Sequence, residues 1–207
     1  MTYSAANRIL LTGFDPFAGF TTNPSATVAR KLDGASIGGC HVVSRILPVV
    51  FGQAGDDLVA AIRETRPAAV ICLGLAARRT DIGIERLAVN LDDADIPDNA
   101  GNQPVEREVV PGAPLAYRAT LPVKVIVTEL QVAGLAASLS MSAGTFVCNH
   151  VFYRLMHYLQ DHPGIPGGFV HLPPVADNDA SPHINLESAV AKIIEVTLSR
   201  TPNRATA

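Results

Sequence analysis

Residues 68–74 form a wholly apolar segment, Ala-Ala-Val-Ile-Cys-Leu-Gly, and this segment limits the possible folds more than any other part of the chain. A strand with one face in water alternates apolar and polar residues, whereas a strand that is covered on both faces is apolar throughout. We therefore expect a central strand of a parallel sheet, with helices packed on both faces of that sheet.

Short strand-like runs alternate with helical patterns along the rest of the chain. The sequence predicts strands at 8–13, 41–47, 85–91, 135–140 and 168–172, and helices at 23–33, 52–65, 122–133, 147–161 and 186–199. Residues 92–114 are polar and rich in Pro, Gly, Asn and Asp, which predicts a long functional loop rather than a linker between domains. We expect residues 1–207 to form a single domain, a three-layer α/β/α sandwich with a mainly parallel twisted sheet, as in phosphorylases and hydrolases. The tail after about residue 201 is expected to fray.

Composition and charge exclude several classes of function. A formal net charge of −3, with no block of like charges, argues against nucleic acid or an anionic membrane surface as a partner. Three widely spaced cysteines without a Cys-x-x-Cys pair argue against a disulfide framework and against a zinc site. The N-terminal residues do not resemble a signal peptide, and no apolar run is long enough to span a bilayer. We therefore expect a cytoplasmic protein without a metal or a cofactor.

Cys148 lies where a small, glycine-containing turn changes into a helical pattern. Val151, Leu155 and Leu159 follow it at helical spacing. A thiol near a helix N-terminus has a lowered pKa and forms a reactive thiolate, so Cys148 is a candidate nucleophile. A cysteine in an apolar run is also commonly a small buried hydrophobe, and the local pattern leaves both interpretations open.

A nucleophilic thiol needs a general base and a group that orients this base. His171 is expected at the carboxyl end of a strand, where open α/β sheets place their sites, although a purely structural histidine is the alternative. Glu85 is the candidate for the orienting carboxylate, although a surface ion pair with Arg86 would also explain it. Four carboxylates compete with Glu85, namely Asp81, Asp92, Asp93 and Asp98. The other five histidines are less well placed: His41, His150, His157, His162 and His183.

The loop after the first predicted strand reads Gly-Phe-Asp-Pro-Phe-Ala-Gly at 13–19. It is not a Gly-x-Gly-x-x-Gly motif, and its proline removes an amide donor, so a dinucleotide cradle is excluded. Phe14 and Phe17 are predicted to form walls of a small, flat, apolar pocket. Simple packing within the loop is the alternative.

Six short runs occur in a fixed order along the chain. They are Leu-Leu-Thr-Gly-Phe-Asp-Pro-Phe at 10–17, Asn-Pro-Ser at 23–25, Glu-Arg-x-Ala-x-Asn at 85–90, Asp-Asp-Ala-x-Ile-Pro-Asp-Asn at 92–99, Ala-Gly-Thr-Phe-Val-Cys-Asn at 143–149 and Gly-Phe-Val-His-x-Pro at 168–173. No single run is decisive, but the ordered set resembles the pyrrolidone carboxyl peptidase (pyroglutamyl peptidase I) family. That family consists of cytosolic cysteine exopeptidases that remove an N-terminal pyroglutamate.

The resemblance implies a role for each matching residue. Cys148 would be the nucleophile, His171 the general base and then acid, and Glu85 the group that orients His171. Phe14 and Phe17 would enclose the pyroglutamyl ring. We assign four further residues to the substrate pocket: Asn23, Leu75, Phe146 and Val147. The resemblance further implies pyroglutamyl peptides as substrates, a thioester intermediate, no cofactor, and a homo-oligomer, either a dimer or a tetramer.

The chain departs from the family pattern at two places. Many relatives have Gly-Gln-Ala-Gly-Gly-Arg-Thr-Asp where this chain has Gly-Leu-Ala-Ala-Arg-Arg-Thr-Asp at 74–81. Leu75 cannot replace the hydrogen bonds of a glutamine. Many relatives also have an arginine where Asp95 stands. These departures bear on affinity and rate, whereas the three residues of the triad are all present.

Two other classes of function are weighed against a peptidase. A non-catalytic or altered-specificity small-molecule-binding protein on the same fold would account for Leu75 and Asp95, but the joint presence of Cys148, His171 and Glu85 argues against it. A nucleoside phosphorylase would need a glycine-rich phosphate cradle with basic residues near it, and the first loop carries a proline and an aspartate instead.

Overall fold

A twisted seven-stranded sheet forms the centre of the molecule in the computed structural model, which describes residues 7–174 and 185–200. The strand order is β2-β3-β1-β4-β9-β5-β8. The strands are β1 (Arg8–Phe14), β2 (Ser36–Ile37), β3 (Cys40–Leu47), β4 (Ala69–Leu75), β5 (Ile82–Glu85), β8 (Ala137–Ser140) and β9 (Gly167–Leu172). Strands β3, β1, β4 and β9 are parallel to one another. Strand β5 runs antiparallel to β9, and β8 runs parallel to β5.

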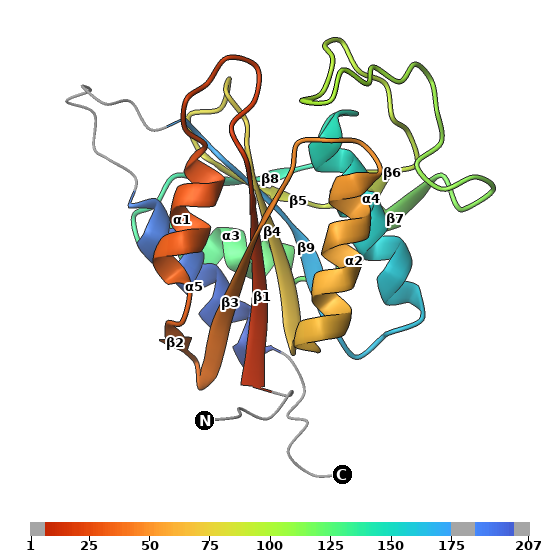
Figure 1. Cartoon of the computed structure of the whole chain (residues 1–207). Coiled ribbons are helices and arrows are strands. Elements are labelled where there is room, and N and C mark those ends of the chain that lie inside the picture. The colour runs from red at the N-terminus through yellow and green to blue at the C-terminus, as the bar shows by residue number, and fades with distance from the viewer. Residues whose placement is uncertain (1–6, 175–184, 201–207) are drawn as a thin grey trace.

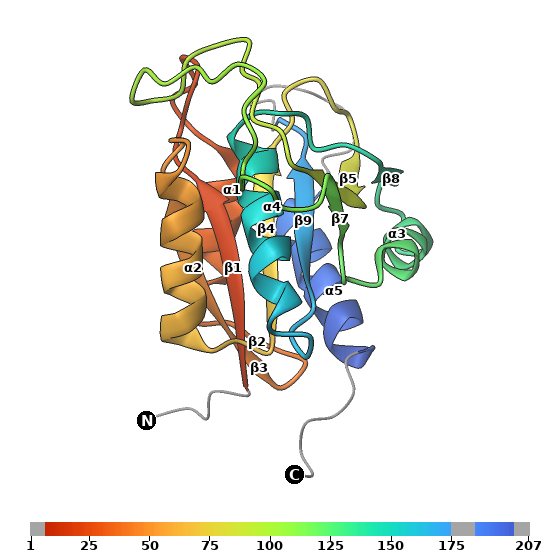
Figure 2. The same ribbon diagram turned by 90° about the vertical axis from the view of Figure 1, so that its right-hand side faces the viewer.

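Helices cover both faces of this sheet (Figures 1 and 2). Helices α1 (Pro24–Leu32), α3 (Val123–Val132) and α5 (Leu186–Ser199) pack on one face. Helices α2 (Gln53–Thr65) and α4 (Val147–Gln160) pack on the other. The predicted three-layer α/β/α sandwich with a mainly parallel sheet is therefore confirmed.

The apolar segment 68–74 corresponds to the central strand β4. All seven of its residues are buried, because α1 and α5 cover one face and α4 covers the other. Its side chains alternate between the two cores: Ile71 and Leu73 join the core under α5, and Val70 and Cys72 join the core under α4. A strand covered on both faces has no solvent face that would favour a polar residue.

The predicted strand over residues 85–91 is wrong. Glu85 is the last residue of β5, and the chain leaves the sheet at Arg86, whose amide N–H donates to Ser140 O. The strand β6 (Leu87–Val89) then pairs with β7 (Ala116–Arg118) in a separate antiparallel sheet. The alternation over 85–91 reflects the half-buried hairpin strand β6. Within these residues it does not reveal the break between the two sheets. The short strands β2 and β7 were not predicted, nor was β5 before its last residue Glu85. The expectations for His183 and for the tail after residue 201 lie outside the described residues.

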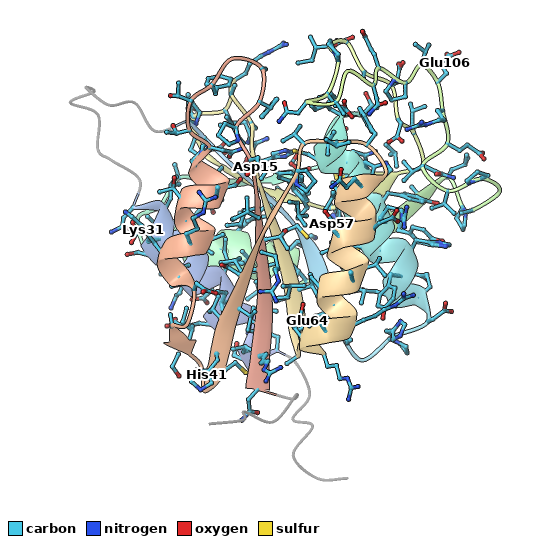
Figure 3. All side chains as sticks on the ribbon, viewed as in Figure 1. Asp15, Lys31, His41, Asp57, Glu64 and Glu106 are labelled. Atoms are coloured by element: carbon cyan, nitrogen blue, oxygen red, sulfur yellow. The ribbon has the colours of Figure 1, made fainter. Side chains whose placement is uncertain are left out.

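The long loop 92–114 lies at the end of the sheet where the central strands end, close to the start of α4 (Figures 1 and 2). One isolated bridge joins Asp92 to Arg107 within it. In Figure 3, Asp15 and Glu106 lie toward this end of the molecule, whereas His41 and Glu64 lie toward the opposite end. Over the two described ranges, no helix has the length and apolar character needed to cross a membrane. The carboxyl ends of β1, β4 and β9 thus share one edge of the molecule with this loop.

Candidate active site

His171 and Glu85 form a buried hydrogen-bonded pair. His171 is the penultimate residue of β9, and its Nδ1 donates to Glu85 Oε1 over 2.8 Å. The two side chains are 8% and 1% exposed, so water reaches neither freely. A carboxylate on Nδ1 fixes the orientation of the imidazole and leaves Nε2 as the atom available for chemistry. The structure thus brings together the predicted base and the predicted orienting group.

The pKa of His171 is raised to about 9. Burial alone would lower this pKa, but hydrogen bonds to Cys148 and Glu85, and the negative charges of both groups, outweigh burial. At neutral pH the imidazole is therefore held in its protonated form between two acidic partners. Such a ring can donate a proton to a leaving group.

Glycines flank His171 on both neighbouring strands. Gly74 of β4 and Gly83 of β5 are its register partners. A Cβ atom on Gly74 would lie 2.9 Å from Cys148 Sγ and 2.7 Å from the Phe169 ring. A bare backbone at Gly74 thus leaves the room in which the thiol approaches the imidazole.

Cys148 is the second residue of α4 and is partly exposed. The N-cap residue of α4 is Phe146, whose side chain makes no capping hydrogen bond, so it leaves the first amide N–H groups of α4 without a capping acceptor. The other two cysteines are buried, and burial raises the pKa of the Cys72 thiol to about 12. Of the three thiols, Cys148 is the one placed beside a histidine and within reach of solvent.

A small apolar pocket opens beside the thiol. It encloses about 210 Å³, part of it continuous with solvent. The rings of Phe17 and Phe146 have centroids 5.9 Å apart at an interplanar angle of 30°. The pocket is lined by all six residues that we assigned to substrate binding, together with the nucleophile candidate and one more residue: Phe14, Phe17, Asn23, Val49, Leu75, Phe146, Val147 and Cys148.

Asn23 supports the pocket by holding its first loop. Its Oδ1 accepts hydrogen bonds from the Ser25 amide (3.1 Å) and the Ser25 hydroxyl (2.8 Å), which caps α1. Its Nδ2 donates to Asp15 O over 3.1 Å. The Ser25 hydroxyl in turn accepts from the amide of Phe14. Asn23 therefore fixes the position of Phe14 relative to α1 as well as forming part of the wall.

The competing carboxylates have partners other than His171. Asp81 pairs with Arg79 at 3.0 Å, and Asp93 accepts from the amide of Glu106. Asp98 Oδ2 accepts from the amide of Phe51 over 2.8 Å. Glu85 is therefore the carboxylate that orients His171, and the alternative of a surface pair with Arg86 fails because Glu85 is buried.

The fourth competitor, Asp92, belongs to a second buried network. Asp92 is fully buried; both its oxygens lie 3.0–3.1 Å from His150 Nδ1, and its Oδ2 also pairs with Arg107 at 3.0 Å. His150 Nε2 accepts from the amide of Gly52, so His150 has no free nitrogen to offer a substrate. This network ties α4, the long loop and the start of α2 together behind the pocket.

Sequence reasoning missed two residues of the site. Val49 follows Leu47 at the carboxyl end of β3, so the same edge rule that selected His171 would have included it. Arg79 lies over Gly83, with its guanidinium carbon 2.7 Å from the position of an added Cβ. Arg79 stands four residues before Gly83, and the family run compared with 74–81 has an arginine at the same position, so the resemblance could have pointed to it. Among the described residues no group of three or more His, Cys, Asp or Glu side chains is arranged to hold a metal ion.

Comparison with known proteins gives a consistent result. The family model described as Pyroglutamyl peptidase matches residues 7–199. A pyrrolidone-carboxylate peptidase of Klebsiella pneumoniae (strain 342) is 53% identical over 165 residues, which are 80% of this chain and 77% of that protein. The pyrrolidone-carboxylate peptidase 1 of Ralstonia nicotianae is 47% identical over 201 residues, 93% of each chain.

Solved structures show the same likeness. The crystal structure of pyroglutamyl peptidase I from Bacillus amyloliquefaciens superposes with a TM-score of 0.89 at 40% identity, covering 94% of this chain and 98% of that one. The pyrrolidone carboxyl peptidase from Thermococcus litoralis gives a TM-score of 0.87 at 37% identity, covering 93% and 94%.

Proposed function

This chain belongs to the pyroglutamyl peptidase family, and from this premise we propose that it releases N-terminal pyroglutamate from peptides by means of Cys148, His171 and Glu85. The activity is that of a thiol exopeptidase of the omega-peptidase type. The observation that carries the assignment of residues is the line from Glu85 through His171 to Cys148 at the mouth of an apolar pocket.

The first half of the reaction forms a thioester. The Cys148 thiolate attacks the carbonyl carbon of the pyroglutamyl residue. The oxyanion that develops is stabilised by amide N–H groups at the start of α4, including that of Cys148. The protonated His171 gives its proton to the leaving amine, and a peptide with a new N-terminus departs.

The second half regenerates the enzyme. His171, now neutral, takes a proton from water, and the resulting hydroxide attacks the thioester carbonyl. Free pyroglutamate leaves and the thiolate–imidazolium pair forms again. Glu85 keeps Nδ1 protonated and in place throughout, so that Nε2 performs both proton transfers.

The pocket suits a neutral, flat acyl group. The pyroglutamyl ring carries no charge at neutral pH, and the pocket walls are three phenylalanines, two valines and Leu75. The lactam N–H and C=O need hydrogen-bond partners when they enter the pocket, and we expect backbone groups of the pocket wall to supply them. An acyl group that lacks the ring carbonyl leaves such groups unpaired and is disfavoured.

The specificity test compares pyroglutamyl and prolyl fluorogenic amides under reducing conditions at neutral pH. We expect turnover of the pyroglutamyl amide and little or none of the prolyl amide, whose ring lacks the carbonyl and carries a protonated secondary amine at neutral pH. Equal turnover of the two amides would contradict the proposed pocket. Binding without any turnover would favour the small-molecule-binding alternative.

Location and assembly are also proposals. We place the protein in the cytoplasm, because a catalytic thiol must stay reduced and cytoplasm is a reducing compartment. We propose a homo-oligomer, a dimer or a tetramer, because four large apolar side chains among the described residues are more than half exposed: Val105, Leu115, Val132 and Met141. Sedimentation equilibrium tests this, and a monomer at micromolar concentration would contradict it.

A further inference from the structure

We propose that Phe169 is a positioning residue for catalysis, because its buried ring is the floor that holds the Cys148 thiol and the His171 imidazole beside each other. The inference rests on the proposed function, since it assigns a role beneath the same site. Phe169 is the third residue of β9 and is fully buried in the core under α4. It stands two positions before His171, so the two side chains project from the same face of the sheet.

The ring of Phe169 lies against the imidazole of His171. Their centroids are 4.9 Å apart, with an interplanar angle of 58°. Because the pKa of His171 is raised, the imidazole is a cation at neutral pH. An aromatic ring within about 6 Å of a cation attracts it through the negative charge on its face. Phe169 therefore stabilises the imidazole both in its place and in its protonated form.

The tip of the same ring reaches the space beside the thiol. A Cβ atom on Gly74 would lie 2.7 Å from Phe169 Cζ and 2.9 Å from Cys148 Sγ, so the ring and the sulfur share the gap above this glycine. Gly74 is the β4 register partner of His171. A sulfur beside the edge of an aromatic ring is in a favourable contact. Phe169 thus borders both of the groups that must react together.

Two further aromatic rings enclose Phe169. The ring of Phe14 lies 6.3 Å away and that of Phe152 lies 5.9 Å away, both measured between centroids. A smaller side chain at this position would leave a cavity directly beneath the reacting groups, and neighbouring side chains would shift into it.

The pocket wall does not depend on Phe169 alone. The amide of Phe14 donates to the Ser25 hydroxyl over 3.0 Å, and this bond fixes the first loop from the side of α1. Loss of the Phe169 ring should therefore disturb the thiol and the imidazole more than the binding of substrate. This difference separates a positioning role from a general loss of packing.

The first test is steady-state kinetics of Phe169→Leu on a pyroglutamyl fluorogenic amide. Leucine keeps the position apolar and removes the ring. We expect kcat to fall by about 10- to 100-fold, with KM within about threefold of the wild type. A folded Phe169→Leu variant with the wild-type kcat would overturn the proposal.

Val170→Ala is the matched control. Val170 is the next residue of the same strand and is equally buried, but it belongs to the core under α3 and α5. The variant should lower the urea midpoint of unfolding, as Phe169→Leu does, and keep kcat within about twofold of the wild type. An equal loss of kcat in both variants would overturn the proposal, because packing anywhere in the strand would then explain it.

The decisive test is a double-mutant cycle on the reactivity of the thiol. The readout is the rate at which iodoacetamide alkylates Cys148 at neutral pH, with the site located by mass spectrometry. Phe169→Leu should slow alkylation about 10-fold in the wild-type background. In the His171→Asn background it should slow alkylation less than about twofold, because the imidazole that the ring positions is absent. Equal slowing in both backgrounds would overturn the proposal.

Alkylation needs no turnover, so this cycle is read independently of the proposed function. A wild-type protein without turnover would contradict the function, whereas the alkylation rates would still decide the role of Phe169. If Phe169→Leu does not fold, Phe169→Met replaces it in each experiment. Methionine fills an irregular apolar space without a ring, so the same losses are expected and the same outcomes would overturn the proposal.

Discussion

At the scale of single residues, the site depends on two positions that carry no side chain. Gly74 leaves room for the Cys148 sulfur, and Gly83 leaves room for the Arg79 guanidinium above β5. A side chain at Gly74 would displace the thiol, and a side chain at Gly83 would displace the guanidinium. Catalytic residues are usually sought among titratable groups, but here the glycines determine which titratable groups meet.

Gly74→Ala should therefore damage catalysis more than stability. The added Cβ would lie within 3 Å of both Cys148 Sγ and the Phe169 ring, so the thiol must move. A displacement of this kind is expected to lower kcat/KM by about 100-fold, with a loss of about 1–3 kcal/mol in the free energy of unfolding.

Gly168→Ala is the matched control for this variant. Gly168 is also a strand glycine with a tight neighbour, 2.8 Å from Leu121, but it faces the core under α3 and α5. We expect similar destabilisation in urea unfolding with kcat/KM nearly unchanged. A full rate in Gly74→Ala would show that the thiol position is not restricted as described.

Glu85→Gln should change the pH dependence of the reaction. The pKa of His171 is about 9 in the wild type, so kcat/KM should fall above this pH as the imidazolium loses the proton that it gives to the leaving amine. The Glu85 carboxylate is one of the groups that raise this pKa. Its removal should shift the alkaline limb to lower pH by about one unit, measured from pH 5 to 10.5. An alkaline limb that stays in place would mean that Glu85 does not act on His171.

At the scale of elements, the start of α4 and the long loop 92–114 form one unit. Asn149, the residue after Cys148, is fully buried; it accepts from the Val89 amide and donates to the carbonyls of Val89 and Leu91. The Thr145 hydroxyl donates to Asp93 O just before the helix begins. The turn that presents Cys148 is thus fixed by hydrogen bonds to the chain that leaves β6.

Asp98 connects the same loop to the pocket wall. Its carboxylate accepts from the amide of Phe51, and the Phe51 ring meets Phe146 edge-on at 5.3 Å. Burial would raise the pKa of Asp98, but hydrogen bonds from Asn102, Phe51 and Ala100 outweigh it and lower this pKa. The carboxylate therefore stabilises the fold in its ionised form.

Asp98→Asn is expected to lower the free energy of unfolding by about 1–2 kcal/mol at pH 7, measured by urea denaturation. Because the folded-state pKa is depressed, this contribution is present above the unfolded-state value of about 4 and is lost as the pH falls through the folded-state value. The difference between wild type and variant should therefore shrink in acid. A difference independent of pH would show that shape rather than charge matters at this position.

A helix or strand could be predicted from the sequence where its own residues form a distinct pattern. The start of α1 follows from Asn23 and Pro24, a capping residue and a proline at the first helical position, and the structure shows both in these roles. The break after Glu85 was missed because β5 and β6 are short. Its one local sign is a change of phase, since the apolar residues of β5 stand at even positions (Ile82, Ile84) and those of β6 at odd positions (Leu87, Val89). The pairing of β5 with β9, which places Glu85 beside His171, depends on the whole sheet.

At the scale of the whole molecule, the sheet edge explains both the success and the limits of sequence reasoning. The rule that sites form at the carboxyl ends of strands selected His171, which lies near the carboxyl end of β9, and the Phe14–Phe17 loop follows the carboxyl end of β1. The roles of Phe146 and Val147 in the pocket came only from resemblance.

The two hydrophobic cores also differ in whether they include residues of the pocket. The core under α3 and α5 contains no residue of the pocket, whereas the core under α2 and α4 includes Phe14, Val49 and Val147 of the pocket wall. Substitutions in the first core should therefore lower stability with little effect on kcat/KM. Substitutions in the second should affect both.

The central claim is that Cys148 is the nucleophile, and the most direct measurement is kcat/KM for a pyroglutamyl fluorogenic amide in wild type, Cys148→Ser and Cys40→Ser. Cys40 is a cysteine of β3, outside the pocket, and serves as the matched control. The account predicts that Cys148→Ser loses at least about 1000-fold while remaining folded, because a hydroxyl does not ionise beside His171 as a thiol does, and that Cys40→Ser keeps the wild-type rate. A folded Cys148→Ser variant with the wild-type kcat/KM would contradict it.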